Sequence, residues 1–326
     1  MSLPTGEVIG ILGDNLRLRR SVLPIPKRHV VGWARELGLP RGGETVLYTG
    51  LMYQLIPYIE ALVRAEQRLG NSWLARFTKW GRMLNKVINI SAFLARPRAQ
   101  ERRVYEQVLI NAALLLQKAG IKFGYAYDAD LYSGALAYDL GLDEAVKRHA
   151  QRVYKALKSV QAKTVITVDP HTTYMLRSVY PKLVPGYDLV VKNYLEVLDE
   201  HLVPNSGGSV HTEPAVLHDP CVFARYEGII EAPRRLLRAS GVEVQEPEKS
   251  GYVTWCCGGP VESLYPEKAA ANARKRMEQL EAAAPRVITM CPLCLVNLSG
   301  AASPGVTVDD ISSYLREGFA QLQNCV

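Results

Sequence analysis

The chain has 326 residues, of which 48% are hydrophobic and 22% charged, and its formal net charge is +7. This length predicts two domains of ordinary size, and the composition argues against extended disorder. No apolar run approaches the roughly 20 residues that cross a bilayer. The N-terminal stretch Met1–Glu7 lacks the basic and apolar regions of a signal peptide, so we expect a cytoplasmic protein with reduced thiols. The mild positive charge indicates acidic partners or an anionic surface rather than nucleic acid.

Residues 1–43 are punctuated by prolines and mixed in charge. We interpret them as an extended lead-in with a short helix at Val30–Leu37. The first clear strand is Glu44–Gly50, where β-branched and aromatic residues end in a glycine. An apolar helix follows from about Met52 to Glu66.

The next stretch, residues 71–103, carries apolar residues at intervals of three and four, which predicts a helical insertion at about residues 70–103. Many basic residues there oppose a single acid, Glu101. Two interpretations remain open: a packed helix with a solvated basic side, or a docking surface for a partner subunit or an anionic membrane face. The apolar positions are Trp73, Phe77, Trp80, Leu84, Val87 and Ile88.

The rest of the chain alternates helices and strands twice over. The first series has helices at 104–119 and 143–158 and strands at 121–127 and 164–168. The second has strands at 215–218, 242–245 and 287–290 and helices at 233–239 and 266–280. Alternation predicts parallel α/β sheets, and the repetition indicates an internal duplication. We therefore predict an α/β fold of two duplicated Rossmann-like lobes related by a pseudo-twofold, at residues 44–205 and 206–326.

Five of the six cysteines lie in the pattern C-x34-C-C-x33-C-x2-C, each just past a predicted strand. Open α/β sheets build their sites at that edge. Scattered buried thiols explain the pattern poorly, and adjacent cysteines bridge each other only with strain. A metal centre remains: zinc or a cubane cluster with four ligands and one spare cysteine, or a cluster with more than four cysteine attachments. The five are Cys221, Cys256, Cys257, Cys291 and Cys294.

This pattern, with the strand-and-helix repeat around it, resembles the cysteine-rich CCG domain found in the catalytic subunits of heterodisulfide reductases and their relatives. The resemblance implies that the five cysteines bind one non-cubane 4Fe–4S cluster, which cleaves or forms disulfide-type bonds. It also implies a flavoprotein and a small ferredoxin-like subunit as partners, and a small thiol or a sulfur-carrier protein as substrate. Peripheral membrane contact and a homo-oligomer are compatible with it.

The first half keeps the scaffold of this motif without its thiols. Leu51 stands where Cys221 stands in the second half. The turn Tyr132-Ser133-Gly134 replaces Cys256-Cys257-Gly258, and Asp169-Pro170-His171-Thr172 replaces Cys291-Pro292-Leu293-Cys294. We therefore expect one cluster rather than two.

Other residues near the motif have open roles. Gly258 and Gly259 would let backbone N–H groups approach a cluster, and Trp255 would shield it from water. Together with Cys257, His218 is a candidate catalytic residue that donates to a sulfide or moves protons, with plain packing as the alternative. Asp169 and His171 cap a helix or take a catalytic or metal role. Arg225 and Arg234 either contact an anionic substrate or partner or lie on a solvated surface, and Cys325 is an exposed spectator.

The sequence shows no G-x-G-x-x-G after a strand and no ferredoxin-type cysteine run, so electrons must pass through partner subunits. Our first hypothesis is a catalytic iron–sulfur subunit of a cytoplasmic heterodisulfide reductase-like complex. The alternative is a non-catalytic structural or electron-relay subunit, with an ordinary 4Fe–4S cluster or zinc in the cysteine site.

Overall fold

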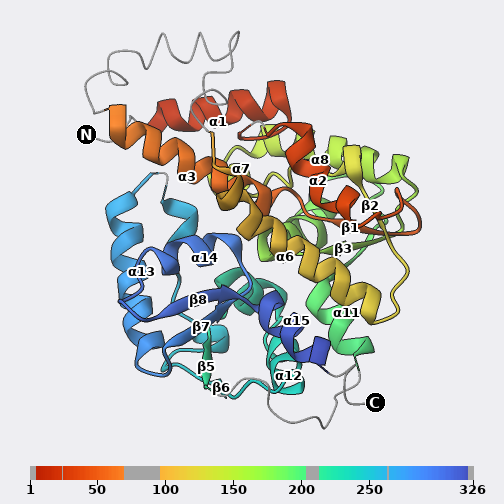
Figure 1. Ribbon diagram of the computed structural model, residues 1–326. Helices are drawn as coiled ribbons and strands as arrows, with labels where there is room; N and C mark the ends of the chain where they lie inside the picture. The colour runs from red at the N-terminus through yellow and green to blue at the C-terminus, as the bar shows by residue number, and fades with distance from the viewer. Residues whose placement is uncertain (1–4, 24, 70–95, 203–212, 263, 322–326) are drawn as a thin grey trace. The chain divides into compact units, whose positions relative to one another are not determined.

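Figure 1 shows a computed structural model of the chain, which describes residues 5–23, 25–69, 96–202, 213–262 and 264–321. The described chain divides into two compact units. The first comprises Met1–Gln107, Phe123–Val165 and Met175–Val190, and the second comprises Val108–Lys122, Ile166–Tyr174 and Val191–Val326. Within the described ranges, no helix has an apolar stretch long enough to cross a bilayer.

The N-terminal segment is helical, which corrects the expectation of an extended lead-in. Its first helix is α1 (Thr5–Arg19), and α2 (Lys27–Glu36) covers much of the predicted short helix. The reason is an apolar face: Val30, Val31, Trp33 and Ala34 of α2 are buried, so this segment contributes to the core instead of lying over it.

The first sheet has the strand order β2-β1-β3-β4. Strand β1 pairs in parallel with β2, and β1 is buried from Val46 to Tyr48. Gly124 of β2 is required by close approach, because a Cβ there would lie 1.9 Å from the carbonyl oxygen of Gly42. The strands are β1 (Thr45–Tyr48), β2 (Gly124–Tyr125), β3 (Thr164–Thr167) and β4 (Val190–Asn193).

Helices and short turns connect these strands. Helix α3 (Met52–Leu69) follows β1, and α6 (Ala99–Lys118) precedes β2. The turn η1 (Tyr127–Ala129), α7 (Ala135–Asp139) and α8 (Asp143–Ser159) lead to β3. After β3 come α9 (Pro170–Tyr174), a π-helical turn η2 (Met175–Val179) and α10 (Tyr180–Leu183), and α11 (Tyr194–His201) follows β4.

The second sheet lies wholly in the second unit and repeats the order of the first, as β6-β5-β7-β8. All three of its strand pairs are parallel. The equal strand orders confirm an α/β fold with two lobes. The strands are β5 (Ala215–Leu217), β6 (Val244–Gln245), β7 (Arg286–Thr289) and β8 (Thr307–Asp310).

Four helices of the second unit connect and cover this sheet, as the lower part of Figure 1 shows. Helix α12 (Glu231–Ala239) packs against α15 (Ile311–Gln321), and α13 (Pro266–Glu281) packs against α14 (Pro292–Ser299). The central strands β5 and β7 are buried along almost their whole length, as expected of a parallel sheet with helices on its faces. The cysteine turns lie at the carboxyl ends of these two strands.

Most predicted elements are confirmed, with differences at their ends. The strands β2 and β6 contain only two residues each, fewer than the predicted ranges. Helix α6 begins at Ala99, inside the predicted insertion, whereas residues 70–95, with the predicted apolar positions from Trp73 to Ile88, lie outside the described residues. The strands β4 and β8 and the helices after them were not predicted.

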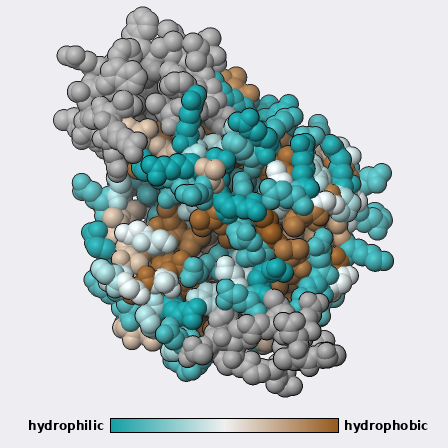
Figure 2. All heavy atoms as spheres, viewed as in Figure 1, coloured by the Kyte–Doolittle hydropathy of each residue, from teal (hydrophilic) through white to brown (hydrophobic). Residues whose placement is uncertain are grey.

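Hydrophilic residues cover much of the face in Figure 2, with hydrophobic residues between them. Most of the large hydrophobic side chains that are exposed in the described chain belong to the second unit. They are Tyr226, Tyr252, Val253, Val261 and Tyr265, against Leu18, Val63, Val104 and Val190 in the first.

Candidate metal centre

Three loops of the second unit carry the five predicted cysteine ligands. Cys221 follows β5, the adjacent Cys256 and Cys257 lie between β6 and α13, Cys291 follows β7, and Cys294 is in the first turn of α14. Because β5 and β7 are neighbouring parallel strands, their carboxyl ends share one edge of the sheet. The topology therefore gathers cysteines from separate parts of the sequence at one place.

The five thiols form one group. The Sγ atoms of Cys221 and Cys256 are 3.9 Å apart, and those of Cys257 and Cys294 are 3.2 Å apart. Hydrogen bonds between Cys256 and Cys257 and between Cys294 and Cys291 join these pairs to the rest. Cys257, Cys291 and Cys294 are buried, whereas Cys221 and Cys256 are half-buried. One side of the sulfur group is thus more open than the other.

The pKa values of the five thiols are shifted in opposite directions, two downward and three upward. Hydrogen bonds from Cys221 and Cys257 lower the pKa of Cys256 to about 2. Burial opposes ionisation of Cys291, but hydrogen bonds from Cys294 and His171 lower its pKa. The pKa values of the other three are raised. Hydrogen bonds with Cys256 are the main cause for Cys221 and Cys257, hydrogen bonds with Cys257 and then Cys291 are the main cause for Cys294, and burial adds to each. Because the thiols repel a further negative charge, a cation is needed to hold all five as thiolates.

This donor set fits an iron–sulfur cluster. Thiolates are the preferred ligands of such clusters and of zinc. Tetrahedral zinc takes four ligands, and so does an ordinary cubane, whereas five sulfurs converge here. In the described chain, a ring nitrogen of His218 and the sulfurs of Cys257 and Cys294 also lie within 4.8 Å of one another.

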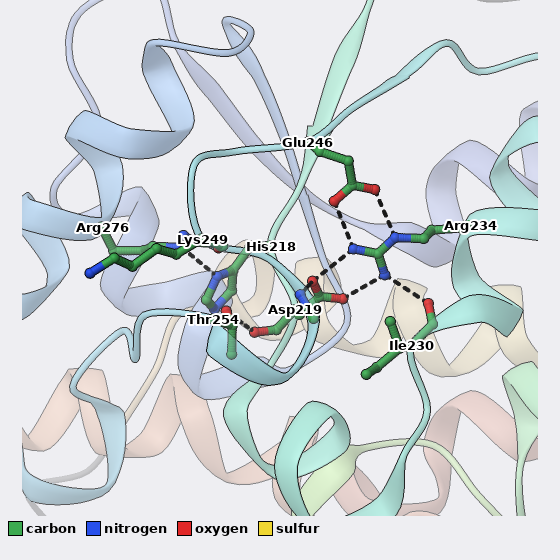
Figure 3. A network of polar contacts seen from close by, with 9 residues as sticks. His218, Asp219, Ile230, Arg234, Glu246, Lys249, Thr254 and Arg276 are labelled. Atoms are coloured by element: carbon green, nitrogen blue, oxygen red, sulfur yellow. Dashed lines mark hydrogen bonds and ion pairs between the residues drawn. The ribbon is translucent and has the colours of Figure 1, made fainter.

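His218 is fully buried at the end of β5. Its Nδ1 accepts a hydrogen bond from Nε of Arg276 on α13, at 3.0 Å (Figure 3). Burial, followed by the charge of Arg276, lowers the pKa of His218 to about 3, so the imidazole is neutral at pH 7. Sequence analysis missed Arg276, because no local pattern distinguishes it from the exposed basic residues on the same helix.

A buried ion-pair network holds the Cys221 loop. Arg234 of α12 binds both oxygens of Asp219 at 2.8 Å and both oxygens of Glu246 at 2.7 and 2.8 Å (Figure 3). Asp219 also accepts from the backbone N–H of Gly251 and, through its carbonyl, from Thr254. The network therefore ties the loop before Cys221 to the loop before Cys256. Arg234 is 5% exposed, which rules out the predicted alternative of a solvated surface, and the carboxylates that it binds belong to this chain rather than to a substrate or partner.

The two glycines of the motif are packed closely. Gly258 has a left-handed φ of 84°, and a Cβ there would lie 2.8 Å from the carbonyl oxygen of Ala269. A Cβ on Gly259 would lie 2.9 Å from Cβ of Leu293 and 3.5 Å from Sγ of Cys257. The N–H of Gly258 donates to Sγ of Cys256 at 3.3 Å. Close packing against α13 and α14 thus accounts for both glycines, in addition to the predicted approach of backbone N–H groups to sulfur.

The remaining predicted residues lie around this group. Trp255 is half-buried, with the ammonium groups of Lys249 and Lys275 at 5.0 and 5.4 Å from its ring. Arg225 is exposed and donates to the carbonyl of Thr254. Cys325 lies outside the described residues.

The turn after β3 contributes to the same unit. Asp169 caps α9, which is one of its two predicted roles, because its Oδ1 accepts from the N–H of Thr172 at 2.9 Å. Burial raises the pKa of Asp169 to about 6. His171, which is 5% exposed, lies with Nδ1 3.9 Å from Sγ of Cys291. Sequence analysis considered His171 for a cap or a ligand and did not predict this contact.

In the first repeat, the buried carboxylate of Asp130 joins the two loops that correspond to the first two cysteine loops. Asp130 accepts hydrogen bonds from the N–H groups of Thr49 and Gly50 and from the hydroxyls of Thr49 and Tyr125. In the second repeat, the pair Asp219 and Thr254 occupies the positions of Thr49 and Asp130 with the two residue types exchanged. Each repeat therefore ties the same two loops together by a Thr–Asp contact.

Comparison with known proteins identifies the family of the segment that carries these cysteines. Residues 215–299 match the model of the CCG family, a cysteine-rich domain. This range contains all five converging cysteines and confirms the resemblance found in the sequence.

Three relatives cover much of the chain. A "probable membrane-anchored ferredoxin" of Chromohalobacter salexigens is 29% identical over 58% of this chain and 30% of its own length. The "probable iron-sulfur-binding oxidoreductase FadF" of Bacillus subtilis is 28% identical over 64% of this chain and 30% of its own length. One subunit of the dihydromethanophenazine:CoB–CoM heterodisulfide reductase of Methanosarcina barkeri is 26% identical over 66% of this chain and 56% of its own length. The chain thus spans 30% to 56% of the length of these relatives.

Proposed function

We propose, from the premise that residues 215–299 form a CCG cysteine-rich domain, that this chain is an iron–sulfur subunit of a heterodisulfide reductase-like oxidoreductase. Its task would be two-electron chemistry on a thiol, disulfide or sulfane-sulfur substrate at a non-cubane 4Fe–4S cluster. The observation that carries the proposal is the convergence of five thiols, one more than a cubane uses. The ligands would be Cys221, Cys256, Cys257, Cys291 and Cys294.

When bound, the cluster supplies electrons and an iron site for sulfur, and the protein supplies position, dryness and electrostatics. Three of the thiolates would anchor the buried side. A substrate sulfur would approach from the opposite side, where Cys221 and Cys256 are only half-buried. His218, next to Cys257 and Cys294, would donate a hydrogen bond to sulfur and stabilise negative charge there.

The overall reaction would convert one disulfide into two thiols with two electrons and two protons, or run in the opposite direction. We propose that the electrons come from a partner flavoprotein or ferredoxin-like subunit, and that the protons come from water. The relatives named as subunits of a heterodisulfide reductase and of a CoM/CoB-dependent fumarate reductase support a multi-subunit setting. The size of the disulfide that the complex accepts would show whether the substrate is a small thiol or a sulfur-carrier protein.

The first test is the composition of the anaerobically purified protein. We expect four iron and four sulfide per chain, the stoichiometry of one 4Fe–4S cluster. Serine variants of each of the five cysteines are expected to lose or alter the cluster, and Cys325→Ser, outside the motif, is the matched control. A colourless protein with stoichiometric zinc would contradict the redox role. If one of the five serine variants retains an unchanged cluster spectrum, four ligands suffice and the non-cubane assignment fails.

An electron-relay function is the second candidate. The first repeat holds no thiol at its three equivalent turns, and two relatives are named as a ferredoxin and as an EtfAB:quinone oxidoreductase. The two candidates differ in what the reduced protein does to a disulfide. Stoichiometric release of thiols from a disulfide by the reduced protein supports catalysis at the site, whereas electron transfer to a partner with the disulfide left intact supports the relay.

A further inference from the structure

Arg276 carries a buried positive charge beside the sulfur group, and it is not part of the five-cysteine motif. Its side chain comes from α13, and the residue is 0% exposed. Nε donates to Nδ1 of His218 at 3.0 Å, and Nη1 donates to the carbonyl of Lys249 and to Oε1 of Gln279, both at 2.8 Å. Figure 3 shows the side chain of Arg276 pointing toward the ring of His218. Three hydrogen bonds thus fix its orientation.

A guanidinium can only donate hydrogen bonds, so the contact decides which imidazole nitrogen carries the proton. Nδ1 must offer its lone pair to Arg276, and the single proton of the neutral ring must then be on Nε2. Nε2 is buried and has no hydrogen-bond partner among the described residues. A ring nitrogen of His218 lies within 4.8 Å of the sulfurs of both Cys257 and Cys294, and Nδ1 is already engaged. The free N–H is therefore the ring atom available to the sulfur group.

The surroundings maintain this arrangement. Burial lowers the pKa of Arg276 only to about 10, so its charge persists at pH 7. That charge disfavours a second positive charge on the neighbouring imidazole, and so does burial. The backbone N–H of His218 also donates to the carbonyl of Ile288 at 2.8 Å, which holds the residue at the end of β5.

We propose that Arg276 is a positioning residue that fixes His218 in the Nε2-protonated tautomer and thereby presents a permanent N–H donor to the sulfurs of Cys257 and Cys294. The consequence for redox chemistry rests on the proposed function. The tautomer itself depends only on the geometry of the second unit. A fixed donor stabilises negative charge on sulfur without a proton being transferred, and it needs no rearrangement during a reaction.

The tautomer can be measured by nitrogen NMR on the full chain, labelled with ¹⁵N-histidine and kept reduced and metal-free to avoid paramagnetic broadening. Nitrogens with and without a proton have well-separated shifts, and His218→Gln identifies the signals of this ring. At pH 7 we expect Nδ1 without and Nε2 with a proton. A proton on Nδ1, or on both nitrogens, in the otherwise unchanged protein would overturn the proposal without any variant of Arg276.

Substitution of the arginine tests the cause. Arg276→Met keeps an unbranched apolar side chain and removes the donor, and we expect a mixture of both tautomers. Arg276→Lys retains a cation and one donor and is expected to keep Nε2 protonated. Arg274→Met changes an exposed arginine of the same helix and serves as the control. An unaltered tautomer in folded Arg276→Met would contradict the role of Arg276.

A second measurement links the tautomer to the cluster. In the reconstituted protein, we expect Arg276→Met to lower the reduction potential relative to Arg274→Met, and Arg276→Lys to restore part of the difference. Equal potentials in all three would overturn the link to sulfur. If the chain contains no iron but the expected tautomer is found, the proposed function fails and the assignment of Arg276 stands.

Discussion

Gly134 and Gly258 adopt the same left-handed backbone conformation, with φ and ψ of 85° and 1° in the first repeat and of 84° and 0° in the second. Gly134 follows Tyr132-Ser133, and Gly258 follows Cys256-Cys257. Each glycine precedes a short helical turn. The turn that positions two thiols is therefore kept in a repeat that has none, because its shape depends on glycine and not on a bound metal.

Alanine at these two positions should have unequal effects. Both substitutions place a side chain at positive φ, which costs about 1–2 kcal/mol. At Gly134 the nearest atom to the new Cβ is 3.6 Å away, whereas at Gly258 the backbone of Ala269 lies at 2.8 Å. We expect Gly258→Ala to reduce the free energy of unfolding in urea clearly more than Gly134→Ala and to decrease the iron content. Equal losses would contradict the assigned packing.

The convergence of the cysteines could be predicted because the spacing and the strand pattern agree. Cys221 and Cys291 each follow an apolar strand, and parallel neighbouring strands end at one edge of a sheet. The expectation of helix capping by Asp169 was equally local, since it needed only the residue type and the following turn. Each of these expectations needs only a residue type and its position after one strand or before one helix, and a short stretch of sequence contains that information.

The contacts that surround the sulfurs could not be predicted in this way. Arg276 is 58 positions from His218, and His171 is 120 positions from Cys291. Both pairs depend on how helices and turns pack in three dimensions. Arg234 illustrates the same limit, because its sequence neighbour Arg235 is exposed while Arg234 is buried.

This neighbouring pair provides the second prediction. Arg234→Met should leave the carboxylate of Asp219 buried without its partner, which destabilises a protein by about 3–5 kcal/mol. Arg235→Met breaks an exposed pair with Asp199, which contributes about 0–1 kcal/mol. Chemical denaturation of both variants measures the difference. Because Asp219 joins the two cysteine loops, Arg234→Met should also bind less iron, and a stability equal to that of Arg235→Met would show that the network is dispensable.

The third prediction concerns acid stability. Burial lowers the pKa of His149 to about 4 from 6.5, so the unfolded chain binds a proton at a pH where the folded protein does not. Stability is complete above pH 6.5 and falls as the pH approaches 4, by about 3 kcal/mol over this window.

The variant His149→Gln can keep a hydrogen-bond donor for the carbonyl of Tyr132, to which Nε2 of His149 is bound at 2.6 Å, and it removes the titrating ring. We expect the difference in stability between pH 7 and pH 5 to be smaller in this variant by about 2 kcal/mol. The exposed His201 provides the control His201→Gln, which leaves the buried ring in place. If the loss of stability at acid pH is unchanged in His149→Gln, groups other than His149 cause it.

The fourth prediction concerns His171. If Cys291 is a cluster ligand, its sulfur can only accept a hydrogen bond, so Nδ1 of His171 must be the donor across the 3.9 Å contact. Such a bond stabilises the reduced cluster, which carries the greater negative charge. Taking about 1 kcal/mol for the bond, His171→Leu should lower the reduction potential by about 40 mV for a one-electron step.

A spectroelectrochemical titration of the anaerobic protein measures this shift. His171→Gln retains an N–H donor and is expected to lie between the native protein and His171→Leu. A general loss of structure would change the iron content of both variants, whereas loss of the hydrogen bond changes the potential while the iron content is maintained. If His171→Leu keeps both its iron and the native potential, the imidazole contributes packing alone, and the turn after β3 has no part in setting the properties of the metal centre.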